Sequence, residues 1–200
     1  MGRLFLYGAS GHAKVVRDIL QQNGDEDFIL LDDNPKIKKL NGDHVFQLNE
    51  VDVQPKDKFL IAVGINETRK EVSKKISNQF FSVIHPHAQI NTKVDIGDGS
   101  MVAAGVVINS DSKVGNHCII NTASSIDHDC VIGNFVHIAP GVTICGGVMI
   151  GEGTLVGAGA TILPNVKIGA WVTVGAGAAV TKDIPDHTTV VGVPAKRINK

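Results

Sequence analysis

His128 stands between two carboxylates, in the tripeptide Asp127-His128-Asp129. A carboxylate beside an imidazole can fix its tautomer and stabilise its protonated form, which makes the histidine a better general base near neutral pH. A second histidine, His137, follows nine residues later. The pattern predicts His128 as a candidate general base, and an ordinary solvated histidine is the alternative.

A metal centre fits the histidine spacing less well. His117, His128 and His137 are separated by eleven and nine residues, whereas the β-helical zinc carbonic anhydrases place two of their ligands much closer together. We therefore predict no metal site, and we expect His117 to be a solvated turn residue.

A glycine-rich turn near the N-terminus is a candidate phosphate site. Gly8-Ala9-Ser10-Gly11 follows an apolar segment and precedes a helical pattern, and Asp32 stands at the end of the next apolar segment. Backbone N–H groups at a helix N-terminus can hold phosphate, and a carboxylate in that place can accept hydrogen bonds from ribose hydroxyls or an imide N–H. The full G-x-G-x-x-G pattern is absent, so nucleotide binding and a merely tight structural turn both remain open.

The elements that carry this turn alternate between strand and helix patterns. Apolar runs predict buried strands, and apolar residues at helical spacing predict the helices between and after them. The alternation predicts a Rossmann-like βαβαβ domain with a parallel sheet over residues 1–81. The predicted strands are 3–7, 28–31 and 59–63, and the predicted helices are 13–22 and 67–76.

The rest of the chain follows a six-residue repeat. Every sixth residue from Ile84 to Val180 is isoleucine or valine, and the residue two places before each of them is small or β-branched. Short strands with one large and one small inward side chain, closed in triangular coils of eighteen residues, explain this period. We predict a parallel β-helix over residues 82–200, in which Ile120, Ile138 and Val156 stack and residues 182–197 cap the last coil.

Composition narrows the functional classes. The net charge of −1 disfavours a protein whose main task is binding nucleic acid, and no apolar run approaches the roughly 18 residues needed for membrane insertion. Cys118, Cys130 and Cys145 form no C-x-x-C pair, which is typical of a reducing cytoplasm. The first two fall at inward positions and the third lacks an activating motif, so we predict no cysteine nucleophile.

Together these segments resemble a known family. The sequence resembles the sialic-acid O-acetyltransferase-like family, and within it the bacillosamine-type UDP-4-amino-sugar N-acetyltransferases. The resemblance implies a left-handed β-helix, acetyl-CoA as co-substrate, and a homotrimer with active sites between subunits. The residues that carry it are Gly8-Ala-Ser-Gly-His12, Asp32-Asp33, Asn121-Thr122, His128-Asp129-Cys130-Val-Ile-Gly133, Phe135-Val-His137 and Gly192-Val-Pro-Ala-Lys-Arg197.

The resemblance also implies roles for individual residues. His128 matches the general base and Asp129 the acid that supports it; relatives have Glu there, so the shorter Asp leaves direct contact or a bridging water open. The positions that match the acetyl-CoA site are His137, Gly146, Ala158 and Ala176. The positions that match the UDP site are Ser10, Gly11, His12, Asp32, Asp33 and Gly64.

We therefore predict acetyl transfer from acetyl-CoA to the 4-amino group of a UDP-linked amino-dideoxy sugar. His128 is expected to act as the general base, and no acyl-cysteine is expected to form. Three alternatives remain: O-acetylation of sialic acid or another sugar, a GDP-linked acceptor such as a perosamine derivative, and a non-catalytic scaffold trimer that binds nucleotide sugars.

Overall fold

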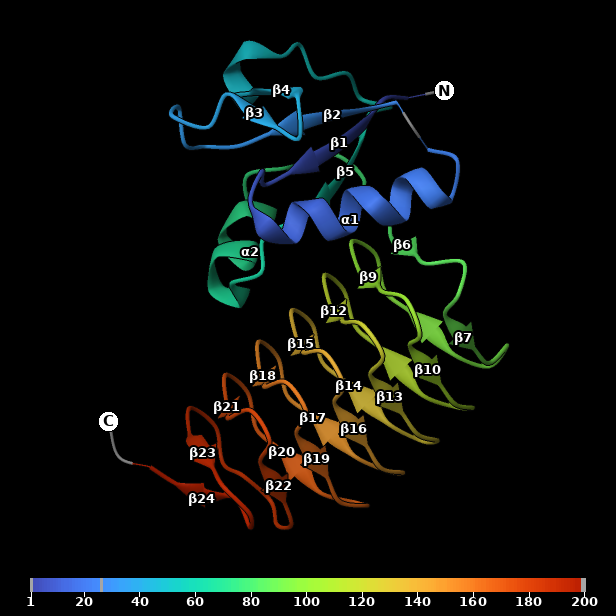
Figure 1. Ribbon diagram of the computed structural model, residues 1–200, viewed down its shortest axis with the longest axis vertical. Helices are drawn as coiled ribbons and strands as arrows, with labels where there is room; N and C mark the ends of the chain where they lie inside the picture. The colour runs from blue at the N-terminus through green and yellow to red at the C-terminus, as the bar shows by residue number, and fades with distance from the viewer. Residues whose placement is uncertain (1, 26, 199–200) are drawn as a thin grey trace.

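The computed structural model describes residues 2–25 and 27–198, which form an N-terminal α/β domain and a β-helix extending away from it (Figure 1). The elements of the domain are β1 (Leu4–Tyr7), α1 (Gly11–Gln22), β2 (Phe28–Leu31), β3 (Lys39–Leu40), β4 (Asp43–Phe46), the 3₁₀ turn η1 (Leu48–Glu50), β5 (Lys58–Ile61) and α2 (Asn66–Ser73). The five strands form one sheet in the order β3-β4-β2-β1-β5. Because β1 pairs in parallel with β2 and β5, the carboxyl ends of these strands lie at one edge.

The predicted α/β architecture is confirmed, with one difference between β2 and β5. That connection carries the β3–β4 hairpin and η1, which were not predicted, in place of the helix that a βαβαβ order requires. Helix α2 follows β5, in agreement with the helix predicted over 67–76. The hairpin turns at Asn41 and Gly42, both of which have positive φ. Asn-Gly is the preferred pair for such a two-residue turn, so the sequence carried a signal that we did not use.

The second half is a β-helix built from two-residue strands in three parallel sheets. Each strand pairs with the strand eighteen residues further along, and Ile120 lies opposite Ile138, which lies opposite Val156, as predicted. The strands are β6 (Val83–Ile84), β7 (Gln89–Ile90), β8 (Asp95–Ile96), β9 (Met101–Val102), β10 (Val107–Ile108), β11 (Lys113–Val114), β12 (Ile119–Ile120), β13 (Ser125–Ile126), β14 (Val131–Ile132), β15 (His137–Ile138), β16 (Thr143–Ile144), β17 (Met149–Ile150), β18 (Leu155–Val156), β19 (Thr161–Ile162), β20 (Lys167–Ile168), β21 (Thr173–Val174) and β22 (Ala179–Val180).

The predicted inward series forms the core of the β-helix from Val102 onward, where every member is buried. The prediction is wrong for Ile84, which is 39% exposed, and Ile90 and Ile96 are only half-buried. These three residues belong to the first coil. No earlier coil covers that end of the core, so its side chains remain accessible.

The far end of the β-helix is closed by a hairpin. β23 (Thr189–Val191) continues one sheet in parallel with β21, and β24 (Lys196–Arg197) pairs with it antiparallel. A reversed last strand ends the repeat and covers part of an otherwise open sheet edge.

The N-terminal domain packs on the sheet that begins with β6, β9 and β12 (Figure 1). Met101, Ala103 and Ile119 belong to the same apolar cluster as the buried side of α1. Contacts of this kind fix the domain on one face of the β-helix, near its first coils.

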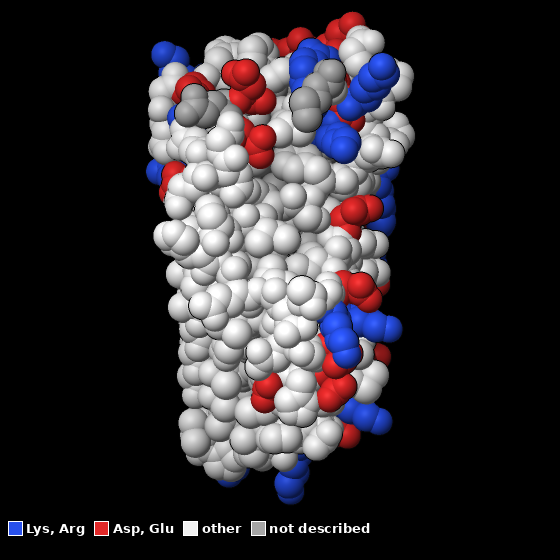
Figure 2. Space-filling model, turned by 90° about the vertical axis from the view of Figure 1, so that its right-hand side faces the viewer, with Lys and Arg blue, Asp and Glu red and all other residues white. Residues whose placement is uncertain are grey.

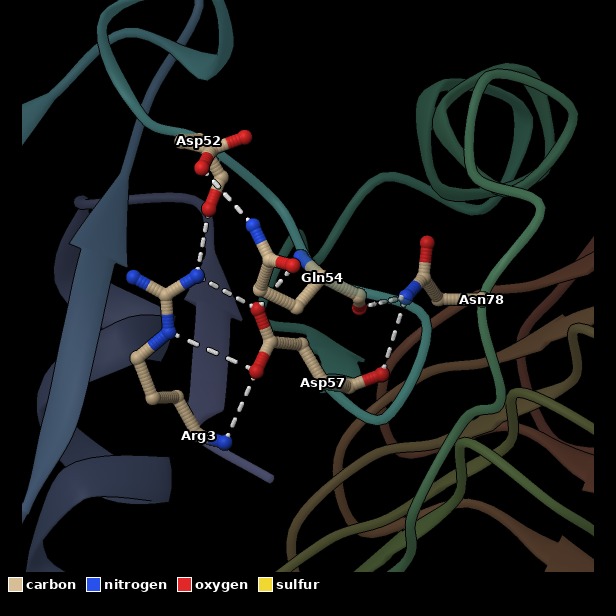
Figure 3. A network of polar contacts seen from close by, with 5 residues as sticks. All are labelled: Arg3, Asp52, Gln54, Asp57 and Asn78. Atoms are coloured by element: carbon tan, nitrogen blue, oxygen red, sulfur yellow. Dashed lines mark hydrogen bonds and ion pairs between the residues drawn. The ribbon is translucent and has the colours of Figure 1, made fainter.

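A polar network ties the chain start to the loop before β5 (Figure 3). The Arg3 guanidinium donates to both carboxylate oxygens of Asp57, with Nη2 2.6 Å from Oδ2. Asp57 also accepts from the backbone N–H groups of Arg3 and Gln54, and Asn78 donates to the Asp57 carbonyl. The network joins residues distant in sequence at the edge of the sheet opposite the glycine turn.

The face formed by β7, β10, β13, β16, β19 and β22 carries no charged side chain on its strands, and Figure 2 shows this side of the β-helix as a broad uncharged surface. Its outward strand residues are Gln89, Val107, Ser125, Thr143, Thr161 and Ala179. Among the described residues, no helix is both long and apolar enough to cross a membrane.

Candidate active site

His128 lies on the corner of the β-helix that joins β13 to β14. Its Nδ1 is 2.8 Å from Oδ2 of Asp129, a residue that adopts the left-handed corner conformation with φ of 59°. The Asp127 carboxylate accepts from the His128 backbone N–H at 2.9 Å and from Asn109 Nδ2 at 2.9 Å. The contact between His128 and Asp129 is therefore direct and needs no bridging water.

These contacts prepare His128 to accept a proton. A Nδ1–H that donates to Asp129 leaves the lone pair on Nε2, and the side chain is 61% exposed. The hydrogen bond that His128 donates to Asp129 and the negative charge of Asp127 raise the pKa of His128. The corner thus holds an accessible imidazole with a fixed tautomer and a stabilised protonated form.

Gly146 lies one coil beyond His128, on the same corner. A Cβ at Gly146 would lie 2.7 Å from both Cε1 and Nε2 of His128, which is inside van der Waals contact. Because glycine has no side chain, the His128 imidazole can occupy this space. Gly146 was predicted to line the acetyl-CoA site, and its contact with His128 within the same chain was not foreseen.

Ala158 and Ala176 lie on a different corner, the one that joins β18 to β19 and β21 to β22. Both are exposed, and the Gly177 N–H donates to the Ala158 carbonyl at 2.8 Å, so the two coils stack directly. The corner of His128 and the corner of Ala158 border the same uncharged face on opposite sides. One chain therefore does not bring these predicted residues together.

His12, Gly64 and His137 do come together, where α1 and the loop after β5 meet β15. The ring centroids of His12 and His137 are 6.4 Å apart, and Gly64 lies next to the His12 side chain. Burial lowers the pKa of each histidine to about 4. Asn121 Nδ2 lies 3.3 Å from His137 Nε2, whereas the buried Nε2 of His12 has no hydrogen-bond partner.

Ser10 and Gly11 form the exposed N-terminal end of α1. The Ser10 side chain makes no capping hydrogen bond, and the first turn holds no acidic residue. The free N–H groups there suit an anionic group. Gly8 precedes them with φ of 112°, and a Cβ there would lie 2.9 Å from the Ala62 carbonyl oxygen, so the turn requires glycine at this position.

Asp32 and Asp33 follow β2 at the same edge of the sheet, but their carboxylates differ in their partners. Asp32 accepts from the N–H groups of Ala9 and Asn34, both at 2.8 Å, and so holds the glycine turn in place. Asp33 accepts from the Tyr7 hydroxyl and from Lys75 at 2.9 Å, and its side chain is half-exposed. Of the two, Asp33 is the more accessible to a ligand.

The structure corrects one histidine prediction and confirms the inward placement of Cys118 and Cys130. His117 was expected to be solvated, but it is buried because Phe80 packs against one side of its ring and Phe135 stacks on it at 4.9 Å. Cys118 and Cys130 are buried, and burial raises the pKa of both thiols, that of Cys118 to about 11. No group of three metal-ligating side chains occurs in residues 2–25 and 27–198.

Sequence reasoning missed two side chains of α2 beside Gly64. Arg69 and Asn66 are buried and donate to backbone carbonyls of the β-helix. A groove next to them is lined by Ile65, His137 and Trp171. Nothing in the polar pattern of residues 66–73 distinguishes the buried Arg69 from its polar neighbours, such as the exposed Glu67 and Glu71.

The fold and the site define a class of protein: acyltransferases in which a hexapeptide-repeat β-helix follows an N-terminal α/β domain. Residues 3–76 match the family model described as the PglD N-terminal domain. Residues 147–182 match the model of the bacterial transferase hexapeptide with six repeats.

Solved structures extend the likeness to the whole chain. The acetyltransferase domain of PglB from Neisseria gonorrhoeae is 35% identical, with a TM-score of 0.93 over 99% of this chain and 100% of that one. PerB from Caulobacter crescentus, solved with CoA and GDP-perosamine, is 35% identical, with a TM-score of 0.91 over 100% of this chain and 98% of that one. The chain belongs to the hexapeptide-repeat sugar N-acetyltransferases.

A curated relative matches over a shorter range. The UDP-N-acetylbacillosamine N-acetyltransferase of Bacillus subtilis (strain 168) is 37% identical over an alignment of 117 residues, and the match covers 52% of this chain. The match spans about half (52%) of the length of the Bacillus protein.

Proposed function

We propose that this protein transfers the acetyl group of acetyl-CoA to the 4-amino group of a UDP-linked amino-dideoxy sugar. The observation that carries the proposal is the His128–Asp129 pair, an exposed imidazole whose Nε2 is free while a carboxylate holds Nδ1. The relatives support the donor and acceptor classes, since PerB was solved with CoA and GDP-perosamine.

In the proposed reaction, the sugar amine attacks the thioester carbonyl directly. The Nε2 of His128 takes a proton from the amine as the C–N bond forms, and the C–S bond then breaks. The same proton passes from the imidazolium to the departing sulfur, which leaves as free CoA. Asp129 stabilises the imidazolium, and general-base help of this kind contributes about 10²–10⁴-fold.

Two copies of the chain would have to supply one site. His128 and Gly146 lie on one corner of the uncharged face, whereas Ala158, Ala176 and His137 lie on or beside the opposite corner. In a closed ring, each copy presents one corner to the opposite corner of its neighbour. We therefore propose a homotrimer in which His128 of one copy faces the His137 side of the next.

The N-terminal domain would hold the nucleotide part of the acceptor. Ser10 and Gly11 offer N–H groups to phosphate, and Asp33 offers a half-exposed carboxylate to the base or ribose. His12, with its unpartnered Nε2, would donate to or accept from the acceptor sugar. Because acetyl-CoA is the donor and the cysteines are free, we place this reaction in the cytoplasm.

The decisive experiment is a substrate panel assayed for free CoA with a thiol reagent and for the acetylated product by mass spectrometry. We expect an N-acetylated product from a UDP-linked 4-amino sugar. A preference for GDP-perosamine, the ligand solved with PerB, would overturn the UDP assignment but keep the reaction. O-acetylation of a hydroxy sugar would replace the amine acceptor, and no turnover with any substrate would favour the scaffold alternative.

The shared site has its own test in mixed trimers. Variants His128→Ala and His137→Ala would each be weakly active alone. Refolded together in equal amounts, they would restore about a quarter of the sites, since each site takes one side from each copy. An apparent mass near three times 21.2 kDa is expected on gel filtration, and a monomer would contradict the proposal.

A further inference from the structure

Arg69 is the largest fully buried side chain of the described residues, and it belongs to α2. Burial lowers its pKa to about 10, so the guanidinium remains charged at neutral pH. All of its hydrogen bonds go to neutral acceptors, and the described structure gives it no ion pair with a carboxylate. A buried charge without a counter-ion is costly, which calls for a reason beyond packing.

On one side, Arg69 and its neighbour Asn66 bind a row of carbonyls on the β-helix. Arg69 Nε donates to His117 O at 2.8 Å and Nη2 to Phe135 O at 2.8 Å, while Asn66 Nδ2 donates to Gly153 O at 3.0 Å. These three corner residues are spaced by eighteen, so the donors contact three successive coils. Arg69 Nη2 also bonds to Asn66 Oδ1 at 2.8 Å, which joins the two side chains.

On its other side, Arg69 holds the loop that follows β5. Nη1 donates to Val63 O at 2.9 Å and to Gly64 O at 3.3 Å. Gly64 is the residue next to the His12 side chain, and its backbone acts to raise the pKa of His137 against the larger effect of burial. One planar cation therefore fixes the loop of the N-terminal domain relative to the coil that carries His137.

The charge of Arg69 acts on the same two imidazoles. The groups that lower the pKa of His12 beyond its burial are His137 and Arg69, and for His137 the charged group is Arg69. Glu67, on the same helix, is the carboxylate whose charge acts on Arg69 itself. A positive charge nearby disfavours the imidazolium forms, so both histidines stay neutral.

We propose that Arg69 is a positioning residue of the acyl-transfer site, which sets the Gly64 loop and the His12–His137 wall against the β-helix so that the acceptor sugar meets the thioester in reactive alignment. The proposal rests on the proposed acetyl transfer. Arg69 acts through Gly64, His12 and His137 and needs no contact with substrate of its own.

Two variants of Arg69 separate the effect of its hydrogen bonds from the effect of its charge. Arg69→Met removes both the hydrogen-bond donors and the positive charge. Arg69→Lys keeps the charge, but a single ammonium group cannot donate to the Gly64 loop and to the carbonyls of the coils at the same time. Arg17→Met is the matched control, because Arg17 pairs with Asp43 and Leu40 within the N-terminal domain and does not contact the Gly64 loop. Circular dichroism and gel filtration would select folded samples before any assay.

We expect kcat/KM for the nucleotide sugar to fall by about tenfold or more in both Arg69 variants, because misalignment of bound reactants is expensive. Ring-proton NMR should show the pKa values of His12 and His137 moving upward in Arg69→Met and little in Arg69→Lys. Arg17→Met should leave both quantities near the wild type.

A folded Arg69→Met protein with kcat/KM within about twofold of the control, or with unmoved histidine pKa values, overturns the proposal. If the methionine variant does not fold, full activity in Arg69→Lys overturns it as well. If the wild type transfers no acetyl group to any acceptor, the proposed function fails. The histidine titrations still decide whether Arg69 sets this wall.

Discussion

The two histidine regions of this chain are tuned in opposite directions. On the corner between β13 and β14, His128 is exposed and its pKa is raised by Asp129 and Asp127. On the His12–His137 wall, where α1 of the N-terminal domain meets β15, burial lowers the pKa of both histidines to about 4, with Arg69 adding to the effect. The same side chain is thus prepared to take a proton in one place and to remain neutral in the other.

This difference in pKa assigns different tasks to the two histidine regions in the proposed reaction. In the proposed reaction a general base needs a pKa near the working pH, and the carboxylates and solvent at the β13–β14 corner would provide it. A neutral imidazole can donate or accept a hydrogen bond without adding charge near a thioester, and the wall provides that by excluding water. In the proposed trimer, the two regions that meet come from different copies.

The sharpest way to break this comparison is to remove the base. We expect His128→Ala to lower kcat by at least tenfold, and by up to about 10²–10⁴-fold if the base supplies its usual share. Binding of UDP, measured by calorimetry, should remain nearly unchanged because no hydrogen bond of His128 reaches the described N-terminal domain. Full activity in this variant would remove His128 from the mechanism, and an acetylated enzyme trapped with acetyl-CoA alone would contradict direct transfer.

A smaller change tests whether the corner needs its geometry as well as its base. In Gly146→Ala, the new Cβ would lie 2.7 Å from the His128 ring and push it away from its present position. We expect kcat to fall by about tenfold to a hundredfold, since small displacements of a catalytic group are costly. Gly24→Ala is the control: Gly24 has φ of 83° but open space, so stability should fall and kcat should not.

The carboxylate beside His128 should control the pH dependence. A base acts only when unprotonated, so kcat/KM should fall as the pH drops through the raised pKa of His128, above its ordinary 6.5. Asp129→Asn removes the largest cause of that rise and should move the acid limb to lower pH, with kcat reduced by roughly threefold to tenfold.

Asp127→Asn should move the limb the same way by less, since that carboxylate lies 4.0 Å from Nε2. A pH profile recorded with saturating acetyl-CoA would measure both. An acid limb that stays in place in Asp129→Asn would show that another group titrates.

The corner was far easier to predict than the wall, for physical reasons. The six-residue period fixes coils of eighteen, so the position of His128 on a corner, one coil from Gly146, follows from counting. Arg69 could not be found this way because its partners are backbone carbonyls 48 and 66 residues away, and carbonyls leave no mark in the sequence. His117 was misjudged for a related reason: the rings that bury it, Phe80 and Phe135, are 37 and 18 residues away along the chain.

The smallest effect on catalysis is expected from a substitution outside both histidine regions, at Asp57, which serves as the reference for the other variants. Asp57 lies in the network of Figure 3, and its pairing with Arg3 lowers its pKa to about 2. A carboxyl group with a depressed pKa in the folded state contributes stability above its ordinary value of 3.8, and that contribution is lost as the pH falls toward 2.

Asp57→Asn should therefore lower the urea midpoint at pH 7 by about 1 M, given the usual worth of hydrogen bonds to a charged group. The two proteins should converge in stability only below pH 2, where the wild-type carboxyl is also protonated. At pH 7 and without urea, kcat and the titrations of His12, His128 and His137 should match the wild type, because this network touches neither histidine region. A marked fall of kcat in folded Asp57→Asn would contradict this expectation. It would show that the His128 corner and the His12–His137 wall depend on the Arg3–Asp57 network, and that their histidine pKa values are not set by neighbouring residues alone.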